Sequence, residues 1–182
     1  LTGEPDGIID DADNVLIGSQ DPGWLAGLIN TFRYKDFDLS VQFNGMFDRK
    51  MQDPTQMAYG LGGGDLARFG YNALRLIQKR WTWDNPSTEY PCSFNGWNTN
   101  YTSGDWYYQN AWFIRLSNIT LGWSLPKTWL ERTKVISKVR ISFSANNLFC
   151  ITPYKGLDPE TDYYTAAYPN ARTYSLGINV TF

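Results

Sequence analysis

The sequence contains no histidine and little charge. Its 182 residues include 16 Lys and Arg, 18 Asp and Glu and only 2 Cys, for a formal net charge of −2. Without histidine the chain cannot form a Ser-His-Asp triad, a Cys-His pair or a histidine-ligated zinc site. Two cysteines are too few for a structural zinc site or a dense disulfide framework. The absence of a basic run argues against nucleic acid as a partner. No apolar run reaches 18 residues, so no transmembrane helix is expected.

Aromatic residues, in contrast, are abundant. They make up 16% of the chain, with 8 Trp, 12 Tyr and 10 Phe, yet the mean hydropathy is −0.42. A soluble domain usually has a more aliphatic core and a more charged surface. A transmembrane β-barrel produces this mixture, because its strands alternate apolar and polar residues while its loops are polar.

Five segments have the character of β-strands. The clearest alternation begins at Phe37, where apolar Phe37, Leu39 and Val41 are separated by polar residues. The expected strands are residues 24–34, 37–47, 112–125, 138–149 and 174–182. Ten residues of a tilted strand climb roughly 25 Å, which is the height of the apolar band of an outer-membrane barrel.

The third of these segments changes phase. Ile114 and Leu116 share one parity, whereas Ile119 and Leu121 share the other. One extra residue near Ser117, a β-bulge, would restore a single apolar face.

The connections between the strands alternate in length. Residues 35–36 and 126–137 are short, and the second could hold one or two helical turns. Residues 1–23, 48–111 and 150–172 are long. Within the 48–111 loop, apolar spacing predicts a helix over 65–82 with Asp65 as its N-cap. Outer-membrane barrels have short periplasmic turns and long extracellular loops, so the long loops are expected outside and the C-terminus in the periplasm.

Aromatic side chains lie near the ends of the expected strands, as in the interfacial girdles of membrane barrels. The expected girdle residues are Trp24, Tyr34, Phe37, Phe47, Phe113, Trp123, Tyr174 and Phe182. Between them, polar residues alternate with the apolar face and are expected to line the barrel interior. These are Asp38, Ser40, Gln42, Asn44, Arg140, Ser142, Asn146, Asn179 and Thr181. Five strands cannot close a barrel, so the chain is expected to be a piece of a larger one.

Several motifs, in order along the chain, resemble SusC/RagA-type TonB-dependent outer-membrane transporters. The most specific is residues 115–126 (RLSNITLGWSLP). The others are residues 6–13 (DGIIDDAD), 17–18 (IG), 37–40 (FDLS), 80–91 (RWTWDNPSTEYP), 146–149 (NNLF), 154–160 (YKGLDPE) and 168–169 (YP).

The resemblance implies the last five strands of a barrel of about 22 strands in the outer membrane of Bacteroidetes, with the plug and TonB box elsewhere. It also implies a SusD-like surface lipoprotein that acts as a lid, TonB as the source of energy, and an oligosaccharide or a peptide as cargo. It implies neither an enzyme nor a required cofactor. A secreted β-sandwich that binds carbohydrate through aromatic loops is the alternative class, and Asp158 with Glu160 is the only acidic pair considered for glycoside chemistry.

The 48–111 loop carries the candidate cargo contacts, because aromatic planes stack on the C–H faces of sugar rings. Packing of the loop or contact with the lid protein is the competing interpretation. The candidates are Trp83, Trp97, Trp106, Tyr107 and Tyr108.

Two further features have structural readings. Asp6, Asp10 and Asp13 resemble part of a calcium loop, although the first half of that motif is poor and an acidic turn held by Asx hydrogen bonds is the favoured interpretation. Cys92 and Cys150 both fall in expected extracellular loops, where a disulfide would tie the loops together. Nothing in their spacing requires that bond.

Overall fold

The structure, a computed structural model, describes residues 13–59, 70, 72–86, 89–90, 92, 105–131, 135–161 and 168–182. They divide into two compact units. The first comprises residues 1–21, 49–111 and 154–168, and the second comprises residues 22–48, 112–153 and 169–182. Each unit is described separately below.

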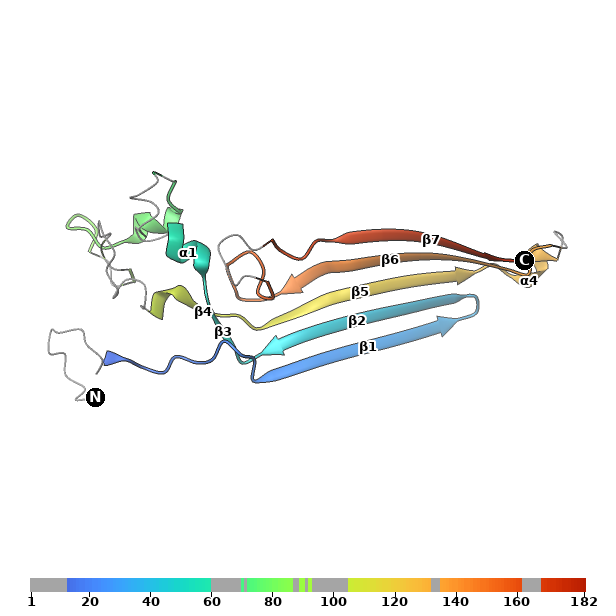
Figure 1. Cartoon of the computed structure of the whole chain (residues 1–182), viewed down its shortest axis with the longest axis horizontal. Coiled ribbons are helices and arrows are strands. Elements are labelled where there is room, and N and C mark those ends of the chain that lie inside the picture. The colour runs from blue at the N-terminus through green and yellow to red at the C-terminus, as the bar shows by residue number, and fades with distance from the viewer. Residues whose placement is uncertain are drawn as a thin grey trace. The chain divides into compact units, whose positions relative to one another are not determined.

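The second unit is a five-stranded antiparallel sheet with the order β1-β2-β5-β6-β7 (Figure 1). Its strands are β1 (Trp24–Tyr34), β2 (Phe37–Phe47), β5 (Phe113–Ser124), β6 (Lys138–Ile151) and β7 (Thr173–Thr181). β1 and β2 have the bounds expected from the sequence, and the other three differ by one or two residues at an end. The expectation of five antiparallel strands is therefore confirmed in a chain that is mostly β, whereas closure into a barrel is not shown by this segment.

The β1–β2 hairpin turns through only Lys35 and Asp36. Tyr34 pairs directly with Phe37, and Lys35 adopts a φ of 53°. A positive φ in a two-residue turn matches the right-handed twist of the flanking strands. The hairpin register therefore places the apolar residues of β2 from Phe37 to Phe43 on one face, opposite alternate residues of β1.

A β-bulge at Ser117 restores the phase of β5, as the sequence predicted. Gln42 of β2 pairs with Asn118, but the next residue, Phe43, pairs with Leu116. Ser117 is thus the extra residue on β5, and it moves Leu116 onto the same face as Ile119.

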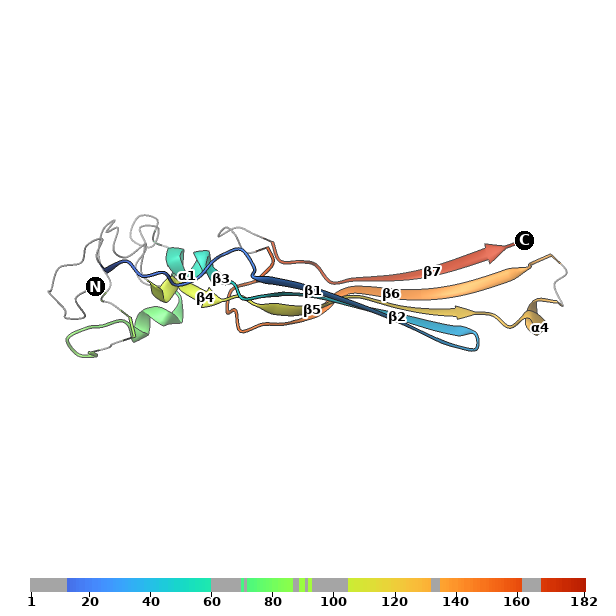
Figure 2. The same ribbon diagram turned by 90° about the horizontal axis from the view of Figure 1, so that it is seen from below.

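The register gives the sheet one apolar face and one largely polar face. Side chains of Phe, Leu, Ile, Val, Trp and Tyr occupy the apolar face, with Asn30 as its polar exception at regularly paired positions. The opposite face is mostly polar, but β1 adds Leu25 and Ile29 to it, β2 adds Met46 and β5 adds Phe113. The strands lie in a single layer (Figure 2), and no described helix packs across either face.

The first unit is built around β3 (Lys50–Gln52) and β4 (Tyr108–Asn110), which pair antiparallel. Met51, Ala111 and Tyr154 form its buried apolar cluster. The sequence analysis read both strands as loop, because three-residue strands give no periodicity. Long-range pairing across the 48–111 segment thus joins its two ends.

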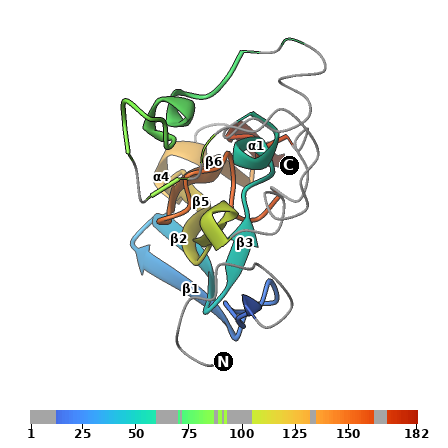
Figure 3. The same ribbon diagram turned by 90° about the vertical axis from the view of Figure 1, so that its left-hand side faces the viewer.

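Three short helices complete this unit: α1 (Pro54–Tyr59), the 3-10 helix η2 (Arg75–Lys79) and the 3-10 helix η3 (Asp105–Tyr107). The chain passes from β3 through Asp53 directly into α1 (Figure 3). Of the helix predicted over 65–82, the described part contains the 3-10 helix η2 and no α-helix. Leu74 has the extended ψ of 152°, and the turn after it uses short-range bonds from Ile77 N–H to Leu74 and from Arg80 N–H to Ile77.

In the sheet unit, α4 (Lys127–Leu130) lies in the short connection after β5, where a helical turn was expected. Pro126 immediately precedes it, and proline is favoured at the start of a helix. Among the described residues no helix is long and apolar enough to cross a membrane.

Candidate functional site

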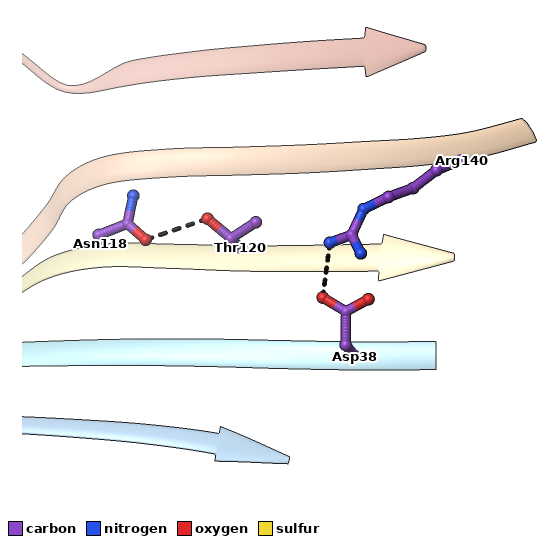
Figure 4. A network of polar contacts seen from close by, with 4 residues as sticks. All are labelled: Asp38, Asn118, Thr120 and Arg140. Carbon is purple, nitrogen blue, oxygen red and sulfur yellow. Dashed lines mark hydrogen bonds and ion pairs between the residues drawn. The ribbon is translucent and has the colours of Figure 1, made fainter. Parts of the chain in front are cut away.

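The polar face of the sheet contains an ion pair that spans three strands. Arg140 on β6 donates to the Asp38 carboxylate on β2, with 2.7 Å between Nη2 and Oδ2 (Figure 4). The strand between them, β5, contributes Gly122, which pairs with Asp38. A Cβ at Gly122 would lie 2.6 Å from Asp38 Oδ1 and would also collide with the guanidinium. The absence of a side chain at position 122 is therefore what lets the pair close.

A chain of amide and hydroxyl groups lies on the same face, running along β5 from Thr120 to Asn118 and then across to β6 and β7. Thr120 donates to Asn118 over 3.0 Å, as Figure 4 shows. Asn118 donates to Asn146 over 2.7 Å, and Asn146 donates to Thr173 over 2.9 Å. These bonds link β5, β6 and β7 through side chains in addition to the backbone ladder. Asn118 and Asn146 are also in register, so the bonds follow from direct pairing across strands.

In the loop unit, buried Asp53 organises a second polar cluster. One carboxylate oxygen accepts the backbone N–H of Gln56 at 2.9 Å, and the other accepts the Gln109 side-chain amide at 2.9 Å. Asp53 is therefore the N-cap of α1, with Pro54 at the favoured first helical position. Gln109 also donates to Gln56 over 3.2 Å and accepts the backbone N–H of Lys155 over 3.0 Å. The sequence analysis missed this cluster, although Asp53-Pro54 followed by Gln56 is a recognisable cap signature.

Next to this cluster lies a small hollow of about 200 Å³. It is lined by Ile17, Gly18, Ser19, Gln20, Lys50, Gln52, Pro54 and Tyr108. Lys50 is the only charged residue of this lining. Its side-chain carbons would lie 3.2–3.8 Å from a Cβ at Gly18, so a larger residue there would press on the lysine stem. The amide, hydroxyl and ammonium groups that line this hollow favour a polar ligand.

The structure separates the five aromatic candidates. Tyr108 lines the hollow, and Trp83 is 88% exposed with its ring edge-on to Trp81 at 5.0 Å. Trp97 lies outside the described residues. Trp106 is half-buried and packs against Tyr107 at 6.0 Å.

The expectation that Tyr107 contacts the cargo is corrected by its burial. It is 2% exposed, so its ring packs inside the unit and is not offered to a sugar. Burial raises the pKa of its phenol. A solvated loop position was expected because Asn, Thr and Gly surround it in sequence. The β3–β4 pairing, which carries the backbone bond from Asp53 N–H to the Tyr107 carbonyl, draws it inward.

Seven of the eight expected girdle residues fit the apolar face or its ends, but Phe113 does not. Phe113 lies on the polar face beside Arg115, whose guanidinium carbon sits 5.5 Å above the ring, and it is only 1% exposed. Because the bulge follows Phe113, residues before and after Ser117 have opposite parity. Trp112 takes the aromatic position at this end and stacks with Phe47 at 6.4 Å.

The proposed cation ligands remain largely outside the structure. Asp6 and Asp10 fall outside the described residues, and Asp13 is exposed. The described part of the chain holds no group of three or more potential metal-ligating side chains.

The disulfide that the sequence allows between Cys92 and Cys150 is not present in the structure. Cys92 and Cys150 are not bridged to each other and belong to different compact units. Cys150 was expected in a loop, but β6 continues to Ile151 and pairs Cys150 with Arg115.

Comparisons with known proteins agree with this architecture. The chain is 30% identical over 97% of its length to the TonB-dependent receptor SusC of Bacteroides thetaiotaomicron, of which it covers 17%. It is 28% identical over 97% of its length to the TonB-dependent receptor P3 of Formosa agariphila, of which it covers 18%. No family profile matches the chain.

Solved structures give the same result. In the open-open state of the RagAB peptide importer, one chain matches 92% of this chain with a TM-score of 0.76 and 28% identity. The closed-closed state matches with a TM-score of 0.74 and 26% identity. In both cases the match covers 18% of the larger chain.

The chain is therefore homologous, over nearly its whole length, to part of the SusC/RagA-type TonB-dependent receptors, a family of transporters and not of enzymes. It spans less than a fifth of the length of the curated relatives that it matches. The five-stranded sheet corresponds to part of the RagA barrel.

Proposed function

We propose that this chain forms part of an outer-membrane transporter that imports a nutrient, with the apolar face of its sheet in lipid. The observation that carries the proposal is the single-layer sheet with opposite faces. In a soluble β-sandwich a second layer covers the apolar face. Here no described element covers it, Leu121 on the central strand β5 is 45% exposed, and Leu176, midway along the edge strand β7, is 73% exposed.

The strand lengths support the same conclusion. β1 and β2 have 11 residues each, β5 has 12 and β6 has 14. Strands of sandwiches are usually near five or six residues, whereas a membrane strand needs roughly 9–11. In the barrel, the polar face with its ion pair and amide chain turns toward the interior, and the long loops face the outside of the cell.

Adjacent residues on β7 provide a direct test, because they point to opposite faces. Leu176→Arg places a charge in lipid, which costs roughly 2–4 kcal/mol near the bilayer midplane. Ser175→Arg, the matched control, places the same charge on the interior face. In the complete receptor, assembly measured by heat-modifiable migration on a gel should fall for Leu176→Arg and persist for Ser175→Arg. Equal behaviour of the two variants would count against a lipid-facing surface.

The cargo is proposed to be an oligosaccharide, with the hollow around Lys50 and Tyr108 and the exposed ring of Trp83 as contacts. These groups combine hydrogen-bond donors and acceptors with aromatic planes, as sugar-binding surfaces do. A peptide is the second candidate, because the matched RagAB structures are of a peptide importer. A SusD-like lipoprotein is proposed as the lid, and TonB, acting through another part of the receptor, as the energy source.

Uptake separates the two cargo classes. Cells that carry the complete receptor, and cells that lack it, are compared for accumulation of fluorescent neutral oligosaccharides and of fluorescent peptides of similar mass. Receptor-dependent accumulation of the oligosaccharides supports the proposal. Accumulation of peptides alone would replace the oligosaccharide with a peptide as cargo.

A further inference from the structure

The connection after β5 contains an exposed tryptophan that does not belong to any strand of the sheet. Trp129 in α4 is 60% exposed. Its neighbour Leu130 is 8% exposed and points inward. A one-turn helix that buries leucine and exposes the larger ring of tryptophan is unexpected on a surface facing only water.

Trp129 continues a row of aromatic rings from the apolar face. Phe37 stacks on Trp123 at 5.9 Å with an interplanar angle of 10°. Trp123 in turn meets Trp129 edge-on, at 6.1 Å and 88°. The row starts on β2, crosses β5 and ends on α4, so α4 extends the edge of the apolar face beyond the strands.

Hydrogen bonds hold α4 at this edge. The N–H of Ser124 donates to the Asp36 carbonyl over 2.8 Å, which ties the end of β5 to the β1–β2 turn. The N–H of Leu125 donates to the Val139 carbonyl over 2.9 Å, and that of Trp129 donates to the Pro126 carbonyl over 3.0 Å. These backbone hydrogen bonds therefore fix the position of the turn that bears Trp129.

Two lysines flank the aromatic row. Lys127 opens α4 and is exposed. Lys35 lies in the β1–β2 turn, with its ammonium 5.3 Å from the centre of the Tyr34 ring. Tryptophan and tyrosine favour the level of the lipid headgroups, and lysines reach from there to phosphate.

We propose that α4 is an interfacial anchor, in which Trp129 lies among phospholipid headgroups and Lys127 and Lys35 contact their phosphates. The inference rests on the proposed membrane location of the sheet. It adds that the short connection is itself a lipid-binding element. We infer phospholipid as the partner because Trp129 is continuous with Trp123 and Phe37 on the apolar face and because two lysines flank this aromatic row.

Depth-dependent quenching tests the anchor in the complete receptor, reconstituted into vesicles of phosphatidylethanolamine and phosphatidylglycerol. A single environment-sensitive fluorophore is attached through Trp129→Cys in a background without other reactive cysteines. Lys127→Cys is a second site on the same turn, in case loss of the Trp129 ring disturbs folding. A nitroxide on the headgroup should quench both labels roughly twofold more than one at mid-chain, as expected for an interfacial residue.

Two controls separate the possible failures. A label at Leu176→Cys on the apolar face should be quenched more by the mid-chain nitroxide, and a label at exposed Trp83→Cys by neither. If position 176 responds as expected while positions 129 and 127 behave like position 83 or position 176, the anchor is overturned and the membrane location stands. If position 176 is not quenched, the proposed function itself fails.

Discussion

Arg140 and Asp38 meet across an intervening strand, and their contact depends on Gly122 lying directly beneath them. Their side chains are 38% and 22% exposed, so the pair is partly screened and is expected to contribute no more than about 1 kcal/mol. Its importance lies in geometry, because it links β2 to β6 on the polar face by passing over Gly122 of β5. The glycine is thus part of the polar face although it has no side chain.

Gly122→Ala should therefore destabilise the sheet by about 1–3 kcal/mol, the usual range for overpacking, by forcing the guanidinium and the carboxylate apart. The measurement is urea-induced unfolding of the complete receptor in detergent, followed by loss of heat-modifiable migration. Gly27→Ala is the matched control, because a Cβ at Gly27 meets nothing within 4 Å. If the two alanine variants unfold at the same urea concentration, the close approach at Gly122 has no energetic consequence.

The cap of α1 leads to a second prediction, in the loop unit. Asp53→Ala removes the acceptor for the Gln56 N–H and for the Gln109 amide, both buried or partly buried. The expected loss of local stability is about 1–3 kcal/mol, from the lost cap and the unsatisfied donors. Hydrogen exchange of the peptide covering 53–59 should accelerate accordingly. Asp84→Ala, at an exposed position, should leave that exchange rate unchanged.

Tyr107 predicts a pH dependence with a definite sign. Burial raises the pKa of its phenol above that of an unfolded tyrosine, near 10. The folded state therefore keeps the proton at pH values where the unfolded chain has lost it. The contribution of the protonated Tyr107 phenol to the stability of the folded state is complete below about pH 10. It is lost as the pH rises through the pKa of Tyr107 in the folded state. Hydrogen exchange of residues 105–111 between pH 8 and 11, corrected for the intrinsic exchange rate, should show this loss, and Tyr107→Phe should abolish it. An unchanged pH profile in the phenylalanine variant would assign the loss to other groups.

Lys50 predicts an effect on binding alone. It is the only charged residue lining the hollow, and its backbone is held independently through a bond from its N–H to Ser19. Lys50→Met keeps the stem over Gly18 and removes the ammonium. Affinity for the transported cargo should fall by roughly tenfold, the equivalent of one charge-assisted hydrogen bond. The urea midpoint of the same variant should match that of the wild type. Unchanged affinity would remove the hollow from the binding surface.

The sequence predicted the sheet well because period-two alternation persists along each strand, and the phase slip in β5 located the bulge near Ser117 and Asn118. It placed Phe113 on the wrong face, since parity was assigned without applying the bulge to the residues before it. It missed β3, β4 and the Asp53–Gln109 bond because these join residues more than 50 positions apart and involve only three paired residues per strand. Local sequence patterns do not indicate such long-range pairing. The burial of Tyr107 was missed for the same reason.

The bulge at Ser117 leads to the last prediction, because register and face are coupled in β5. Deleting Ser117 removes the extra residue, so that everything before it rotates to the opposite face relative to β2. Arg115 and Phe113 would then turn to the apolar side, and Ile114 and Leu116 would turn to the polar side. Arg115 in lipid costs about 2 kcal/mol or more, depending on its depth. Assembly of the complete receptor should therefore fail.

Ser117→Ala is the matched control, because it retains the extra residue and loses only a long contact, 3.5 Å from its hydroxyl to the Arg115 carbonyl. That variant should assemble normally in the same heat-modifiability assay. A deletion that assembled as well as Ser117→Ala would mean that the phase of β5 is not what sorts its side chains between the two faces.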